Sequence, residues 1–118
     1  MISDYRLLLI NFHLQQLHIK TKGTHVLTTQ EQLKYSRQIM MEKVGEEGQT
    51  KLRNAKILIV GMGGLGNPVS LYLAAAGVGT LYLADGDTVE ISNLPRQVQF
   101  NEQDINQNKA DTAAEKLS

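Results

Sequence analysis

A glycine cluster between two apolar runs constrains the fold of this chain more than any other feature. In ILIVGMGGLGNPVSLYLAAAGVGTLYLADGD, residues 57–87, Gly61, Gly63 and Gly66 form G-x-G-x-x-G, and Gly64 adds further backbone room. In such a motif the first glycine allows a sharp turn, the second exposes the backbone to phosphates, and the third lets a helix pack closely on a strand. Free N–H groups at the start of that helix attract anions. The segment therefore predicts a strand, a glycine turn and a helix.

The flanking residues predict an α/β fold. The run KILIV at 56–60 is typical of a strand buried on both faces of a parallel sheet. We expect a helix over 65–77, with Pro68 in its first turn, where proline is tolerated. A second strand is expected over 80–84 and a closing helix over 107–117. This order predicts the first strand-helix-strand-helix unit of a Rossmann-like, doubly wound fold, which is incomplete within 118 residues.

The part of the chain before the glycine cluster gives weaker patterns. Residues 1–27 fit either a short amphipathic helix or an alternating strand, and we take them as an N-terminal extension of unknown role. A capping box, formed by Thr28 with Glu31 or by Thr29 with Gln32, predicts a helix from about 30 to 44, preceded by N-terminal linker sequence. The stretch GEEGQ is expected to end that helix, with a short helical turn over 48–54.

Composition excludes several classes of function. Lys plus Arg and Asp plus Glu number 12 each, so no broad nucleic-acid or acidic-lipid surface is expected. The chain has no cysteine, which excludes a disulfide, a thiolate nucleophile and a cysteine zinc site within it. No apolar run approaches the roughly 20 residues of a membrane span, and no secretory signal is recognisable. The three histidines lack metal-site spacing. We expect a cytoplasmic protein with no nucleic-acid or membrane partner and no metal ligand of its own.

An acid at the end of the second strand strengthens the prediction of a nucleotide site. Asp85 follows Gly66 by 85 − 66 = 19 residues, close to the roughly 20 expected for a ribose-binding carboxylate. Together the glycines and Asp85 favour nucleotide binding over a turn whose glycines serve packing only. They fit NAD and ATP equally well.

The residues after Asp85 bear on the choice of nucleotide. A triphosphate needs cations around it, and Arg96 and Lys109 are candidates if their loop folds back over the glycine turn. Asn93 and Gln97 carry amides that can hydrogen-bond phosphate oxygens. On spacing alone, ordinary surface cations are the better interpretation of Arg96 and Lys109.

Five motifs in order resemble the ThiF/MoeB/HesA family, bacterial relatives of ubiquitin-activating enzymes: YSRQI (35–39), GMGGLG (61–66), LADGD (83–87), SNLPRQ (92–97) and Lys109. The likeness covers about residues 30–118, and SLYLAAAGVGTLYLAD is most similar to the ThiF branch, which serves thiamine biosynthesis. The resemblance implies a doubly wound ATP-binding domain, commonly a homodimer. It also implies ATP-dependent adenylation of the C-terminal glycine of a ubiquitin-like sulfur-carrier protein.

The resemblance also implies roles for individual residues. The glycine turn would hold the phosphates and Asp85 the ribose hydroxyls, while Asn93, Arg96, Gln97 and Lys109 would approach the triphosphate. Arg37, in YSRQ, would reach the ATP site of the partner subunit; without the family it reads as a solvated helix residue. Arg96, Lys109 and Arg37 are thus the candidate catalytic cations. Pro95 stands where the family often has glutamine, and the proline stiffens the loop.

Family members are longer than this chain, so we expect an N-terminal fragment in which residues 28–118 are the first part of the ATP-binding domain. The aspartate that holds magnesium and the cysteine pairs that hold structural zinc would lie beyond its C-terminus, and two strands alone would leave open sheet edges. Three alternatives remain open. The first is MoeB-type adenylation of a molybdopterin-synthase carrier, and the second is a fragment of an NAD-binding oxidoreductase. The third is a non-catalytic module for carrier binding or dimerisation.

Overall fold

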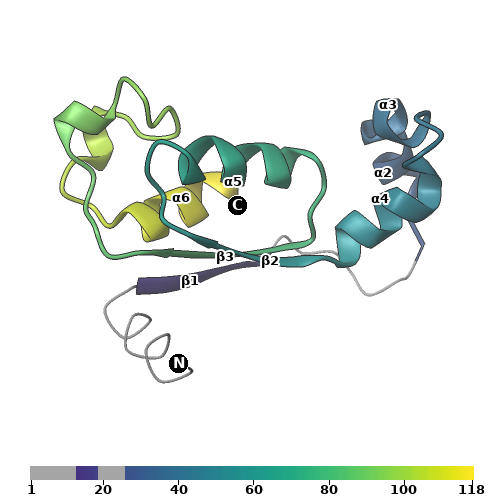
Figure 1. Cartoon of the computed structure of the whole chain (residues 1–118), viewed down its shortest axis with the longest axis horizontal. Coiled ribbons are helices and arrows are strands. Elements are labelled where there is room, and N and C mark those ends of the chain that lie inside the picture. The colour runs from purple at the N-terminus through teal and green to yellow at the C-terminus, as the bar shows by residue number, and fades with distance from the viewer. Residues whose placement is uncertain (1–12, 19–25) are drawn as a thin grey trace.

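A parallel pair of strands forms the centre of the computed structural model, which describes residues 13–18 and 26–118 (Figure 1). β2 (Lys56–Val60) and β3 (Thr80–Asp85) run side by side in register, with Ile59 opposite Leu83. Both strands lie where the sequence predicts them. The glycine turn follows β2 directly, and β3 ends at Asp85, so the carboxyl ends of the two strands lie together at one edge of the sheet.

A third strand pairs with the other edge of β3. β1 (His13–His18) is antiparallel to β3, with His13 opposite Asp85, and the strand order is β1-β3-β2. The sequence left helix and strand open for residues 1–27, and the structure places a strand in this part. The remaining alternatives for residues 1–12 and 19–25 lie outside the described residues. One of the two sheet edges that we expected to be open is therefore paired.

Two helices cover one face of the sheet. α5 (Gly66–Ala75) starts at the end of the glycine turn, and α6 (Lys109–Leu117) lies beside it on the same side of the strands (Figure 1). The core lies between these helices and the strands and consists of Ile59, Met62, Val78, Leu81, Leu83, Val89, Phe100, Ala110 and Ala113. No described helix is long and apolar enough to cross a membrane.

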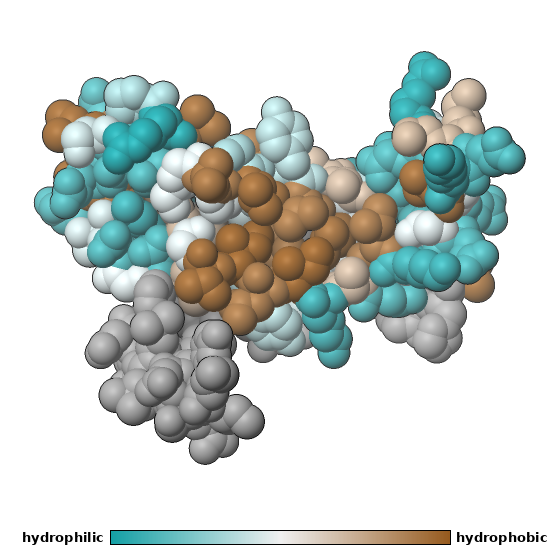
Figure 2. All heavy atoms as spheres, viewed as in Figure 1, coloured by the Kyte–Doolittle hydropathy of each residue, from teal (hydrophilic) through white to brown (hydrophobic). Residues whose placement is uncertain are grey.

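β2 is buried on one face only, which corrects the expectation of burial on both. Ile59 is 9% exposed, whereas Leu58 and Val60 are 50% and 55% exposed. Successive side chains of a strand point to opposite faces, and within the described residues β2 is an edge strand whose covering helices lie on one side. Figure 2 shows apolar side chains gathered across the middle of the molecule, where Figure 1 places β2 and α5.

The predicted helix over 30–44 is wrong as a single helix. The structure has α2 (Thr29–Lys34) and α3 (Ser36–Ile39), separated at Tyr35. Tertiary contacts explain the interruption: the Tyr35 ring lies against Gly77, and the side chain of Gln38 donates a hydrogen bond to the Ala76 carbonyl at 3.0 Å. These contacts with the end of α5 outweigh the small gain from a continuous helix.

The stretch GEEGQ starts a helix instead of ending one. α4 (Gly45–Asn54) includes the whole predicted turn over 48–54, and Gly45 takes a positive φ of 59° at its first position. Two acids in the first turn complement the positive end of the helix dipole. Gln49 and Arg53 are buried against the rest of the molecule. Tertiary burial and charge thus compensate for two glycines that disfavour a helix.

Candidate functional site

The glycine turn between β2 and α5 divides its glycines between two tasks. Gly61 takes a positive φ of 96°, and a Cβ on Gly66 would lie 1.7 Å from the carbonyl oxygen of Gly61. By contrast, a Cβ on Gly64 would meet no atom within 4 Å, and one on Gly63 would meet only the Gln97 amide nitrogen at 3.9 Å. Gly61 and Gly66 therefore shape the turn, while Gly63 and Gly64 leave open space beside it. Open space of this kind is what a phosphate needs to approach the backbone.

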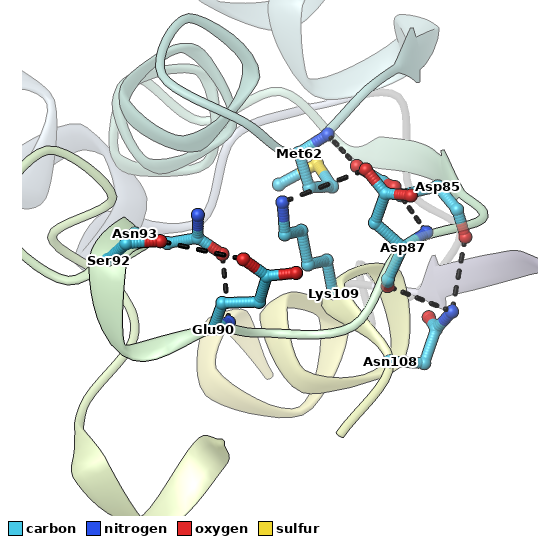
Figure 3. Close-up of polar contacts among 8 residues, drawn as sticks. All are labelled: Met62, Asp85, Asp87, Glu90, Ser92, Asn93, Asn108 and Lys109. Atoms are coloured by element: carbon cyan, nitrogen blue, oxygen red, sulfur yellow. Dashed lines mark hydrogen bonds and ion pairs between the residues drawn. The ribbon is translucent and has the colours of Figure 1, made fainter. Parts of the chain in front are cut away.

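Asp85 is fixed at the end of β3 by two backbone N–H groups. Its Oδ2 accepts a hydrogen bond from Met62 at 2.6 Å and its Oδ1 one from Asp87 at 2.8 Å (Figure 3). The residue is only 6% exposed. Each carboxylate oxygen has a second lone pair, so hydroxyl groups can still donate to it. The carboxylate stands beside the middle of the glycine turn, held in one orientation.

Lys109 brings a nearly buried ammonium to the same place. It is the first residue of α6 and is 7% exposed, and Figure 3 shows its side chain reaching toward Met62 and Asp87. Its Nζ lies 3.9 Å from Oδ2 of Asp87, whose side chain is 80% exposed. The Lys109 N–H also donates to the Asp87 carbonyl at 3.0 Å, and the Asn108 side chain donates to the Asp85 carbonyl at 3.1 Å. The start of α6 is thus tied to the end of β3.

The loop between β3 and α6 carries the other predicted residues. Asn93, in the short 3-10 helix η1 (Ile91–Asn93), is buried and accepts a hydrogen bond from the Glu90 N–H at 2.8 Å. Gln97 is 2% exposed beside Gly63, and its Oε1 has no hydrogen-bond partner in the described part of the chain. Arg96 is exposed and donates to the carbonyl of Ser92 at 2.8 Å. Asn93 therefore shapes the loop, and Gln97 reaches the turn.

The structure gathers most of the predicted site at one end of α5. Asp85, Lys109 and Gln97 surround the glycine turn, while Arg96 lies on the outer side of its own loop. Arg37 is exposed on α3, which Figure 1 shows at the opposite end of α5. Arg37 is therefore not part of the site formed by its own chain.

Sequence reasoning missed a polar cluster under the loop. The backbone N–H of Gln99 donates to Oδ1 of Asn67 at 3.0 Å, and the Gln99 side chain donates to the Asn67 carbonyl and to Oγ of Ser70. Asn67 and Ser70 are fully buried in α5. The signal was present in the sequence, since Asn67 and Ser70 lie three residues apart and share one face of a mostly apolar helix. Asp87 and Asn108 were also missed, although DGD places a second acid two residues after Asp85.

No group of three or more histidine or acidic side chains in the described parts of the chain could hold a metal ion. The described residues thus form no ready-made cluster of protein ligands for zinc or magnesium. Both metals remain expectations from the family resemblance.

Comparisons with known proteins agree on one family. The model of the ThiF family matches residues 35–118. The chain is 52% identical over 98 residues to an adenylyltransferase and sulfurtransferase, uba4, of Emericella nidulans, covering 83% of this chain and 20% of that protein. It is 49% identical over 86 residues to the sulfur carrier protein ThiS adenylyltransferase of Escherichia coli K12, covering 73% of this chain and 34% of that protein. The chain thus spans about a fifth to a third of the length of these relatives.

A solved structure shows the same architecture. The crystal structure of E. coli MccB with ATP superimposes with a TM-score of 0.58 and 48% sequence identity, covering 58% of this chain and 20% of that one. Together with the parallel β2–β3 pair, this likeness confirms the predicted Rossmann-like class.

Proposed function

The chain belongs to the ThiF family, and we propose that residues 28–118 form the first part of an ATP-binding domain that adenylates the C-terminal glycine of a ubiquitin-like sulfur-carrier protein. Two relatives support this proposal through their names, a ThiS adenylyltransferase and an adenylyltransferase and sulfurtransferase. MccB, a structural relative, was crystallised with ATP. Within this class we propose a ThiS-like carrier, in thiamine biosynthesis, and MoeB-type adenylation of a molybdopterin-synthase carrier is the second candidate.

The observation that carries the proposal is the open glycine turn with a fixed acid and a nearly buried ammonium beside it. The open space at Gly63 and Gly64 admits phosphates to the backbone, where N–H groups at the start of α5 attract negative charge. Asp85 offers oxygens to ribose hydroxyls. Lys109 adds positive charge in a place with little water, where each charge interacts more strongly than on the surface.

The proposed reaction needs no protein nucleophile. A carboxylate oxygen of the carrier's terminal glycine attacks the α-phosphorus of ATP, a new oxygen–phosphorus bond forms, and the bond between the α-phosphorus and the bridging oxygen breaks as pyrophosphate leaves. Negative charge grows on the non-bridging and leaving oxygens, and fixed N–H groups and cations stabilise it without reorganising. The protein therefore acts by positioning and electrostatics. We propose that the backbone of the turn, Lys109, Arg96 and Gln97 supply this stabilisation.

We further propose a homodimer in which Arg37 contributes to the ATP site of the partner subunit. Its exposure on α3, at the far end of α5 from its own glycine turn, supports a role in trans. The exposed Leu58 and Val60 leave one face of β2 uncovered by the described residues, which supports a further layer or a partner subunit over this face. We propose magnesium as the companion of the triphosphate. No cluster of three or more acidic or histidine side chains among the described residues could hold it alone, so the ATP phosphates would supply most of its ligands.

Two measurements test the proposal. Titration of the protein with ATP and with NADH separates an adenylating domain from an oxidoreductase, and we expect ATP to bind more tightly. Exchange of labelled pyrophosphate into ATP should then depend on an added sulfur carrier, with a ThiS-like carrier more effective than a molybdopterin-synthase carrier. Tighter binding of NADH would contradict the proposal. Carrier binding without exchange would favour the non-catalytic module.

A further inference from the structure

We infer that Gln99 and Asn67 are positioning residues that hold the loop of Arg96 and Gln97 at the glycine turn. This inference rests on the proposed function, because it concerns the same nucleotide site. Neither residue belongs to the motifs that identify the family in this chain. Their contacts form the most direct hydrogen-bonded link between this loop and α5 in the described structure.

Both ends of the link lie close in sequence to the residues that they position. Asn67 immediately follows Gly66, the last glycine of the turn, and Gln99 lies two residues after Gln97. The N–H of Gln99 donates to Oδ1 of Asn67 at 3.0 Å, and Nε2 of Gln99 donates to Oγ of Ser70 at 2.7 Å. Because so few bonds separate these contacts from the turn, a shift of Gln99 moves Gln97 by a similar amount.

Burial makes the link rigid. Asn67 and Ser70 are 0% exposed, and Gln99 is half-buried above them. Next to it, the N–H of Phe100 donates to the Gln97 carbonyl at 3.0 Å, and the Phe100 ring is in the core. Hydrogen bonds away from water hold a loop in place more firmly than exposed ones, because broken partners there are not replaced by water.

The link matters because the Gln97 amide lies beside the open space at the turn. Its amide nitrogen is 3.9 Å from the position of a Cβ on Gly63, the glycine that leaves room for phosphate. A displacement of about 1 Å in such a group can cost on the order of 100-fold in rate. Gln99 and Asn67 would thus act on the nucleotide through the loop and not by touching it.

A double-mutant cycle on ATP affinity tests this role. Gln99→Met removes the amide and keeps the size of the side chain, and Gln103→Met makes the same change at an exposed position of the next segment. We expect Gln99→Met to weaken ATP binding about 10-fold or more. In a Gln97→Met background the same change should weaken it less than about 3-fold, because Gln99 acts through Gln97 and the two effects are then not additive. Gln103→Met should have no effect in either background.

The outcomes separate a failure of the proposed function from a failure of the positioning role. If the unchanged protein does not bind ATP, the proposed function fails and this inference with it. If the unchanged protein binds ATP and Gln99→Met behaves like Gln103→Met, only the positioning role is overturned. An equal effect of Gln99→Met with and without the Gln97 amide also overturns it, because a general loss of packing would act independently of Gln97. If Gln99→Met does not fold in a urea titration, Ser70→Ala, which removes the Oγ acceptor of Gln99, takes its place in the cycle.

Discussion

Asp85 and Met62, 23 positions apart in the chain, are joined by a hydrogen bond of 2.6 Å from the Met62 N–H to the Asp85 carboxylate. The bond fixes the end of β3 to the middle of the glycine turn. The second carboxylate oxygen accepts the N–H of Asp87 at 2.8 Å. The residue predicted to bind ribose thus also holds the turn in shape, so its removal should affect folding as well as binding.

Asp85→Ala should lower the free energy of unfolding by about 3 kcal/mol, because it leaves two N–H groups without their acceptor in a nearly buried place. Asp85→Asn, which keeps one acceptor oxygen, should lose about half as much. Urea titration of both variants measures the loss. Glu115→Ala, an exposed change on α6, is the control. Equal urea midpoints for Asp85→Ala and Glu115→Ala would show that the two hydrogen bonds carry no stability.

Arg96→Ala should separate catalysis from folding. The side chain is exposed and, within the described part of the chain, hydrogen-bonds to the carbonyl of Ser92 in its own loop, so the free energy of unfolding should change by less than about 0.5 kcal/mol. Carrier-dependent pyrophosphate exchange should fall by a factor of about 10² to 10³, as when one donor to a developing charge is lost. Lys51→Ala, exposed on α4, is the matched control. An undiminished exchange rate would remove Arg96 from the catalytic groups.

Two lysines of α6 should respond in opposite ways to the same substitution. Lys109→Met removes a nearly buried ammonium. Its partner, the Asp87 carboxylate, lies 3.9 Å away and is exposed to solvent. We expect a change in unfolding free energy below about 1 kcal/mol and ATP binding weakened at least about 10-fold, or 1.4 kcal/mol. Lys116→Met should leave ATP binding unchanged. It should lower the free energy of unfolding, because the nearly buried Asp104 loses the ammonium that lies 2.5 Å from its carboxylate. Equal ATP affinities for the two variants would contradict a nucleotide role for Lys109.

Local patterns predicted the parts of the site that local chemistry decides. The glycine spacing, the strand that precedes it and Asp85 at the end of the next strand all lie within one short segment, and the structure arranges them as expected. The start of the closing helix was expected at 107 and lies at Lys109, because Asn108 serves as its N-cap. The turn and the N-cap are determined by residues that are neighbours in sequence, and Asp85 ends the next strand of the same strand-helix-strand unit.

Contacts between distant residues decided what the sequence did not predict. The break at Tyr35 depends on the end of α5, and the exposed face of β2 depends on which elements lie beside the strand. Asn67 and Gln99 meet across 32 positions, and no periodic pattern in one segment indicates such a pair. The position of Arg96 also depends on the shape of its loop, which spacing alone does not determine.

Glu31, on α2, should make the free energy of unfolding depend on pH in the acidic range. The Thr28 N–H donates to the Glu31 carboxylate at 2.7 Å, and this bond, with Arg53 nearby, holds the pKa of Glu31 below its ordinary value of 4.5. A lowered pKa in the folded state means that ionised Glu31 stabilises the fold above about pH 4.5, and that this contribution is lost as the pH falls through the lowered pKa. Urea titrations of the protein and of Glu31→Gln should therefore differ at pH 6 and converge at lower pH. The exposed Glu42→Gln serves as the control, and a pH-independent difference would exclude Glu31 as the source.

The two tasks of the glycines can be separated by the same substitution at two positions. In Gly66→Ala the new methyl would lie 1.7 Å from the Gly61 carbonyl oxygen, a backbone atom that cannot move without opening the turn. We expect this variant to lose at least about 3 kcal/mol of stability. In Gly64→Ala the methyl enters open space at an ordinary φ, so stability should be nearly unchanged while ATP binding weakens, because the methyl occupies the space proposed for phosphate. Urea and ATP titrations of both variants give the comparison, and unimpaired ATP binding by Gly64→Ala would place the phosphates elsewhere.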